Sequence, residues 1–133
     1  MRILESALYA ENLEETAAFY EAILGLERFI EVPDRHVFFR VPGGVMLLFN
    51  PKATTQAPRD PRMPVPPHGA TGPGHICFAG TAEEITSWTE HLSDNSIAIE
   101  AAFQWPQGGR SIYFRDPAGN SIEIAEPRIW GLD

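Results

Sequence analysis

Three ionisable side chains stand within short apolar segments: Glu5 in residues 3–10, His75 in 74–79 and Glu123 in 121–125. If these segments are strands, alternation turns each ionisable side chain away from neighbours that pack under helices. Such a group is costly to bury unless it is charged and paired. A cation is a natural partner, and two carboxylates with one imidazole suit Zn²⁺, Mn²⁺ or Fe²⁺.

These residue types do not by themselves single out a site, because a strand glutamate is usually solvated and a strand histidine is more often structural. Other candidates lie nearby in the sequence. Tyr113 precedes Glu123 by ten residues across an expected hairpin, so it can share the same face and donate a hydrogen bond; a packed strand tyrosine is the alternative. Cys77 lies on the expected face of His75 and is interpreted as a small apolar filler.

Three further residues are candidates for substrate binding. Arg110 is a possible anion clamp, with an ordinary surface arginine as the alternative. Ser111 follows it directly. His68 follows two prolines and can cap the site as part of a lid.

The same order of expected elements occurs in each half of the chain. In the first half, residues 3–10 indicate a strand. A helix follows that Asn12 can cap and Gly25 ends. The second half repeats a strand at 74–79 and a helix that begins at Thr81 and ends at Asp94-Asn95. The strands expected after the two helices are 27–32, 36–41 and 45–49, then 97–104, 110–115 and 121–125.

Short connections rich in proline and glycine join these strands, and Asp116-Pro117-Ala118-Gly119-Asn120 is a strong hairpin signal. Parallel crossovers would instead need a helix between successive strands. We therefore predict an α+β fold of two βαβββ modules with mixed sheets, over residues 1–51 and 74–133. Residues 52–73 are rich in proline and lack a periodic pattern. They are either a plain linker or a functional lid.

Composition narrows the possible partners. The chain has 133 residues, which suits one domain, and no apolar run long enough to span a membrane. A net charge of −8 disfavours nucleic-acid binding. The one cysteine can form no internal disulfide, and the charged N-terminus does not resemble a signal peptide. A cytoplasmic protein with a small-molecule partner is expected.

Three stretches carry a family resemblance. Leu8 to Glu14, with Phe19-Tyr20 and Leu24-Gly25-Leu26 after it, forms the first stretch. The second is Gly74 to Phe78, and the third and most specific is Tyr113 to Glu123. Together they resemble the vicinal-oxygen-chelate superfamily, which includes glyoxalase I, extradiol dioxygenases, and fosfomycin or bleomycin resistance proteins. The resemblance covers nearly the whole chain.

In that superfamily two modules form a curved mixed sheet around a divalent metal, and the ligands come from the first and last strands of each module. Carried over, the resemblance makes Glu5, His75 and Glu123 the metal ligands, for Zn, Mn, Ni or Fe. Leu47 falls at the fourth position and cannot ligate. The fourth protein ligand usual in glyoxalase I is therefore missing. Extradiol dioxygenases usually have two histidines and one carboxylate, and here Glu5 replaces the first histidine, so neither pattern is matched in full. Three ligands leave room for substrate oxygens.

The resemblance implies a metal-dependent enzyme of the glyoxalase type, chelating a small oxygenated substrate for lyase or isomerase chemistry. Glu123 is the expected proton-moving group, and Tyr113 matches a tyrosine that faces the site in fosfomycin resistance enzymes. One alternative is an Fe(II) extradiol-type dioxygenase. The other is a non-catalytic drug-binding protein of the bleomycin-resistance type, which needs no metal. The identity of the substrate stays open.

A homodimer with shared sites is also expected. One module exposes an ionisable sheet face and cannot close a cavity alone, and in this superfamily the facing module often comes from a second chain. Pairing of the two modules within one chain is the alternative.

Overall fold

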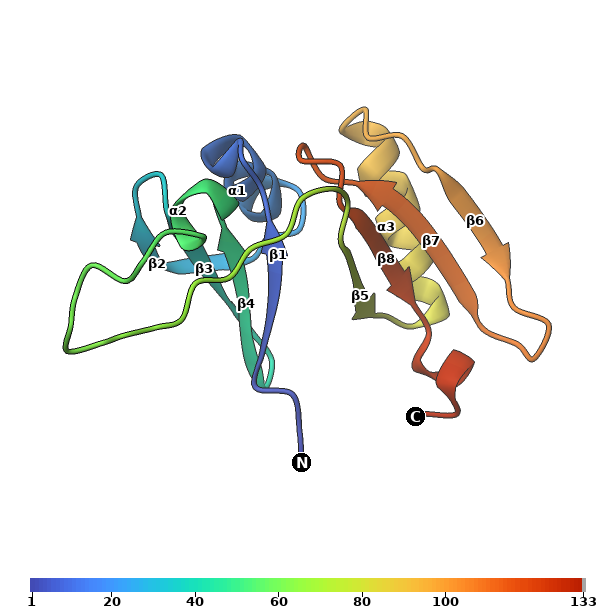
Figure 1. The fold of residues 1–133 in the computed structure, drawn as a ribbon. Coiled ribbons are helices and arrows are strands. Elements are labelled where there is room, and N and C mark those ends of the chain that lie inside the picture. Colours follow the sequence, from blue (N-terminus) through green and yellow to red (C-terminus); the bar gives the residue numbers. More distant parts are fainter. Residues whose placement is uncertain (133) are drawn as a thin grey trace. The chain divides into compact units, whose positions relative to one another are not determined.

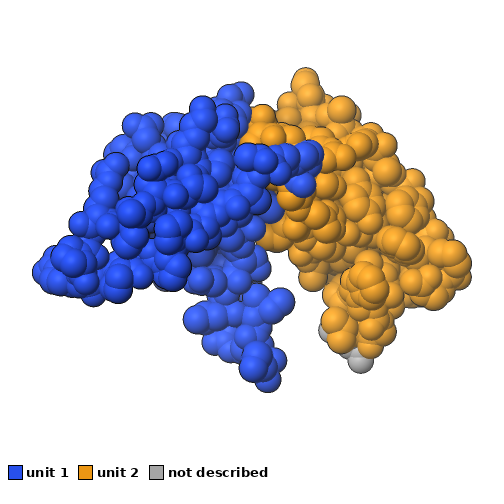
Figure 2. All heavy atoms as spheres, viewed as in Figure 1, with its two compact units in different colours: residues 1–73 blue, residues 74–133 orange. Residues whose placement is uncertain are grey.

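The computed structural model describes residues 1–132, and the chain divides into two compact units, Met1–Pro73 and Gly74–Asp133 (Figure 2). Each unit contains a four-stranded mixed sheet with a helix packed against it (Figure 1). The predicted α+β fold of two βαβββ modules is confirmed. The proline-rich residues 52–73 fall within the first unit.

The first unit is ordered β1-β4-β3-β2, with β1 parallel to β4 and the other neighbours antiparallel. Helix α1 ends just before Gly25, which adopts the left-handed φ of 67° that glycine tolerates best. The core includes Leu8, Tyr20 and Phe39, all buried. The elements are β1 (Glu5–Tyr9), α1 (Leu13–Ala22), β2 (Glu27–Val32), β3 (His36–Val41), β4 (Gly44–Phe49) and α2 (Pro51–Thr54).

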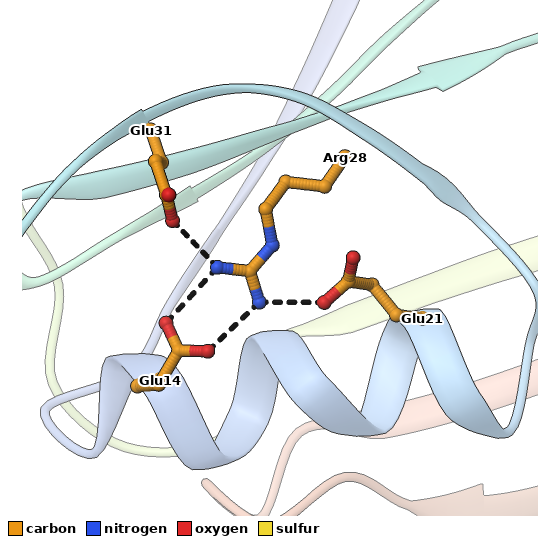
Figure 3. Close-up of polar contacts among 4 residues, drawn as sticks. All are labelled: Glu14, Glu21, Arg28 and Glu31. Carbon is orange, nitrogen blue, oxygen red and sulfur yellow. Dashed lines mark hydrogen bonds and ion pairs between the residues drawn. The ribbon is translucent and has the colours of Figure 1, made fainter.

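One arginine ties α1 to β2. The guanidinium of Arg28 donates to Glu14 and Glu21 on the helix and to Glu31 on its own strand, at 2.6 to 3.0 Å (Figure 3). The Arg28 side chain is 16% exposed, whereas the Glu14, Glu21 and Glu31 side chains are 74%, 41% and 55% exposed, so water still screens the carboxylate charges. The hydrogen bond to Arg28 is the main reason that the pKa of Glu14 lies below its usual value.

The second unit repeats this topology as β5-β8-β7-β6, with β5 parallel to β8. Thr81, the expected start of this helix, forms a reciprocal capping box with Glu84 at the beginning of α3. Ile85 and Leu92 of α3 are buried, as are Ile112 and Phe114 of β7. The elements are β5 (His75–Ala79), α3 (Ala82–Asp94), β6 (Ala101–Gln104), β7 (Arg110–Arg115), β8 (Ser121–Ala125) and η1 (Pro127–Trp130). The strand expected at 97–104 is thus shorter.

The loop between β7 and β8 is held by two buried polar side chains. The carboxylate of Asp116 accepts from the backbone N–H groups of Ala118 and Asn120 and from the Asn120 side chain. The side-chain oxygen Oδ1 of Asn120 in turn accepts from the backbone N–H of Gly74, at 2.8 Å. Asn120 therefore locks the hairpin loop to the residue that precedes β5.

Replacing Asn120 with alanine should destabilise the protein by about 2–3 kcal/mol, because it removes the two hydrogen bonds that the Asn120 side chain makes, one to Asp116 Oδ2 and one from the backbone N–H of Gly74. Urea unfolding followed by circular dichroism measures this change. Gln104→Ala, which truncates an exposed amide on β6, is the control and should shift stability by less than about 0.5 kcal/mol. Equal effects of the two substitutions would contradict the role given to Asn120.

After α2, residues 55–74 form no further helix or strand but are not detached from the first unit. The backbone N–H of His68 donates to the Thr54 carbonyl at 3.0 Å. The His68 ring also hydrogen-bonds through Nδ1 to the Tyr9 hydroxyl at 2.7 Å. Residues near His68 are therefore anchored to both α2 and β1. No helix among residues 1–132 combines the length and hydropathy needed to cross a membrane.

Candidate functional site

Strand pairing in the second unit brings several polar side chains to one face of its sheet. Cys77 of β5 lies beside Glu123 of the parallel strand β8, and Tyr113 of β7 lies on the other side of Glu123. His75 is two residues before Cys77 and so shares its face. Ser111 is two residues before Tyr113 and joins the same group. Adjacent strands thus gather these side chains around Glu123.

Glu123 is a buried carboxylate, 6% exposed, and a hydrogen-bond chain fixes one of its oxygens. Ser111 Oγ donates to Glu123 Oε1 at 2.6 Å. Trp105 Nε1 in turn donates to Ser111 Oγ at 2.8 Å, which commits the serine hydroxyl proton to Glu123. The other oxygen, Oε2, lies 3.3 Å from Nε2 of His75.

The backbone sets the orientation of the His75 ring. Its Nδ1 lies 3.1 Å from the carbonyl oxygen of Ser121, which can only accept, so Nδ1 carries the proton. In the neutral ring Nε2 then presents a lone pair toward Glu123 Oε2. Two electron-rich atoms at this separation require a proton or a cation between or beside them. Second-shell carbonyls hold metal-ligating histidines in this way.

The donor atoms fit a small divalent cation. Metal–ligand distances of about 2.0–2.2 Å place two neighbouring ligands about 3.0–3.4 Å apart, and the observed 3.3 Å falls in that range. Over residues 1–132, however, no three His, Cys, Asp or Glu side chains form a group that could hold a metal. The structure brings His75 and Glu123 together, whereas Glu5 belongs to the first unit, where it lines a cavity with His68.

The environment of Glu123 shifts the titration of two neighbours. Burial, followed by the charge and hydrogen bonding of Glu123, raises the pKa of Cys77 to about 12. Burial and then Glu123 likewise raise the pKa of Tyr113 to about 12, so the phenol stays a hydrogen-bond donor at neutral pH. Cys77 is exposed on the face that it shares with Glu123, so it does not fill a gap in the core as the sequence suggested.

In metal-free protein at pH 8, Cys77 should react with Ellman's reagent at least about tenfold more slowly than it does in the urea-unfolded chain, despite its exposure. The reason is that the thiolate is scarce far below a pKa of about 12. Glu123→Gln removes the repelling charge and should accelerate the folded-state reaction. The measured rate belongs to Cys77 alone, because the chain has one cysteine. A folded thiol as reactive as the unfolded one would contradict the raised pKa.

Two of the candidate substrate-binding residues have other placements. Arg110 donates to Thr86 Oγ1 and to the Ala82 carbonyl, both on α3. Its side chain therefore lies on the helix-covered face, apart from Glu123. Ser111 lies in the group but hydrogen-bonds Glu123 itself. The sequence does not decide whether Trp105 lines the site or an interface, because its bond to Ser111 crosses an irregular turn that strand alternation does not describe.

The first unit has the same register but different side chains. Leu47 pairs with Ala7 as Glu123 pairs with Cys77, so Leu47 occupies the position equivalent to Glu123. Phe38 pairs with Leu47 as Tyr113 pairs with Glu123. The positions of Glu123 and Tyr113 in the second unit are thus apolar in the first, whereas Glu5 is a polar residue at the position of His75.

Comparison with known proteins gives a consistent result. The model of the Glyoxalase/Bleomycin resistance protein/Dioxygenase superfamily matches residues 2–124. A lactoylglutathione lyase from Agrobacterium tumefaciens is 39% identical, with a TM-score of 0.94 over 98% of this chain and 97% of that one. Among curated proteins none matches significantly.

Two more distant structures share the fold. A virulence protein from Salmonella typhimurium is 25% identical, with a TM-score of 0.68 over 95% of this chain and 96% of that one. A fosfomycin resistance protein from Listeria monocytogenes is 21% identical, with a TM-score of 0.68 over 95% and 93% of the two chains. At 21% identity the likeness to the resistance protein concerns the fold alone.

Proposed function

The chain belongs to the Glyoxalase/Bleomycin resistance protein/Dioxygenase superfamily, and we propose that it is a metal-dependent enzyme of the glyoxalase type. Its reaction would be a lyase or isomerase step on a small oxygenated substrate. The observation that carries the proposal is the 3.3 Å approach of His75 Nε2 to Glu123 Oε2, with both side chains oriented by further hydrogen bonds. The 39% identity to a lactoylglutathione lyase supports the reaction class.

His75 and Glu123 would hold a divalent cation, Zn, Mn, Ni or Fe, with Glu5 as the third ligand. Bound there, the cation would supply Lewis acidity toward a carbonyl oxygen. Arg110 forms no part of this proposal, because its guanidinium lies on the helix side of the sheet.

Glu123 is also the residue proposed to move the proton. Its Oε1 is fixed by Ser111, whereas Oε2 faces His75 and is the oxygen that would take a proton from carbon and return it to a neighbouring atom. Burial of Glu123 limits exchange of that proton with water. Tyr113 keeps its proton at neutral pH and can donate a hydrogen bond to a substrate oxygen.

His75→Ala should remove most of the bound metal, because a three-ligand site has no ligand to spare. Ser111→Ala should weaken metal affinity by about 10–100-fold through loss of the hydrogen bond that orients Glu123. Elemental analysis and chelator competition measure both effects. His91→Ala is the control, since His91 lies on α3 and should leave metal content unchanged.

Activity assays separate the alternatives. Wild-type protein loaded with Zn²⁺, Mn²⁺ or Ni²⁺ should catalyse the lactoylglutathione lyase reaction or a related lyase reaction, and Glu123→Gln should lose that activity. Ring cleavage with Fe²⁺ and O₂ would instead indicate a dioxygenase. Protein that binds none of these metals under any loading condition would refute the proposal and favour metal-free drug binding.

We further propose a cytoplasmic homodimer whose sites are shared, with Glu5 of one chain completing the His75–Glu123 pair of the other. The need to cover apolar surface supports dimer formation: Trp130 is 76% exposed and Leu132 is 61% exposed. The one cysteine supports a reducing compartment.

Mixing Glu5→Ala chains with His75→Ala chains tests the sharing of sites. In a heterodimer with shared sites one intact site returns, so up to about half of the metal and activity per heterodimer should be restored. Native mass spectrometry verifies that the chains have exchanged. If exchange is complete and neither metal nor activity returns, the ligands come from a single chain.

A further inference from the structure

A cavity of about 640 Å³ lies on one face of the first unit's sheet. Strands β1, β3 and β4 form its floor, and residues 65–68 of the proline-rich segment bound it on another side. His68 contributes to this wall and is held in place by Tyr9 and Thr54. Among the lining residues are Glu5, Leu47, Phe38, Phe49, Arg35 and His36.

Flat rings form much of the lining. The ring of His36 stacks on Phe38 at 4.2 Å between centroids, with an interplanar angle of 11°. Phe49 stands edge-on to Phe38 at 5.4 Å and to His68 at 4.6 Å. Because these rings pack on one another, their orientations are set before a ligand enters. Such a surface favours a flat apolar group.

Two residues of this lining are apolar, whereas the residues at the equivalent positions of the second unit are polar. Leu47 stands where Glu123 stands, and Phe38 stands where Tyr113 stands. The first unit therefore offers an apolar surface beside Glu5, not a second set of charged ligands.

Two polar groups at the cavity have no strong partner. Arg35 makes one long hydrogen bond, 3.4 Å to the Ala53 carbonyl, and no ion pair with any of residues 1–132. Nδ1 of His36 is buried without a hydrogen-bond partner. A guanidinium with spare donors beside an apolar cavity is suited to a carboxylate.

We infer that this cavity is a subsite for a substrate portion that is flat, apolar and carries a carboxylate, with Arg35 binding the anion and the rings of His36, Phe38 and Phe49 packing on the apolar body. The inference deepens the proposed function, since it names the substrate class for a site in which Glu5 is proposed as a ligand. Occupation of the subsite itself needs no metal.

Phenylacetate, its neutral analogue phenylacetamide, and acetate are matched probes for metal-free protein. Phenylacetate should bind in the millimolar range typical of a small fragment, more tightly than either other probe. It should shift the imidazole NMR signals of His36 and His68 and leave that of His91, on α3, unmoved. Arg35→Met should weaken phenylacetate binding about tenfold and remove its preference over phenylacetamide. Arg59→Met, at an exposed arginine in the same unit, should retain both.

Chelator-treated protein and the Glu5→Gln variant keep this test separate from the metal proposal. Glu5→Gln should bind phenylacetate at least as tightly as wild type, because a nearby negative charge is removed. Retained binding there, even if no metal site exists, supports the subsite. The inference is overturned if phenylacetate fails to shift His36 and His68, if it shifts His75 instead, or if Arg35→Met and Arg59→Met behave alike.

Discussion

The arrangement of the second unit's polar side chains depends on the buried carboxylate of Glu123. A charge with 6% exposure is tolerated only when each oxygen has a partner. One partner comes through Ser111 and Trp105, and the other position faces His75. Strands β5, β7 and β8 must hold their register for all of these contacts to form together. Asn120 and Asp116 fix that register at the loop next to β5.

The two units share one strand topology and register, but the side chains at equivalent positions differ in polarity. Parallel pairing of the first and last strands of each unit places Leu47 and Glu123 at equivalent positions. An aliphatic side chain leaves an apolar cavity in the first unit, whereas a carboxylate organises a polar group in the second. The difference between leucine and glutamate at this register position thus accompanies an apolar surface in one unit and a polar group in the other.

Local signals made most of the fold predictable. The capping box at Thr81, the left-handed Gly25 and the hairpin loop before β8 all act through near neighbours, so the sequence displays them directly. Strand alternation also predicts the face on which Arg110 lies. Arg110 and Tyr113 are an odd number of residues apart on β7, so their side chains point to opposite faces of the sheet. The bond from Trp105 to Ser111 and the cavity wall near His68 depend on irregular backbone, which has no period to detect.

Charge balance connects the proposed ligand set with the proposed subsite. Glu5, Glu123 and a neutral His75 would carry two negative charges, which one divalent cation neutralises. A third carboxylate, at the position of Leu47, would leave a net negative charge and repel an anionic substrate. Leucine at that position removes this repulsion and adds apolar surface next to the rings of Phe38 and Phe49. Arg35 then supplies the one lining cation without an ion-pair partner in residues 1–132. An anionic substrate with an apolar body is the ligand that satisfies both conditions.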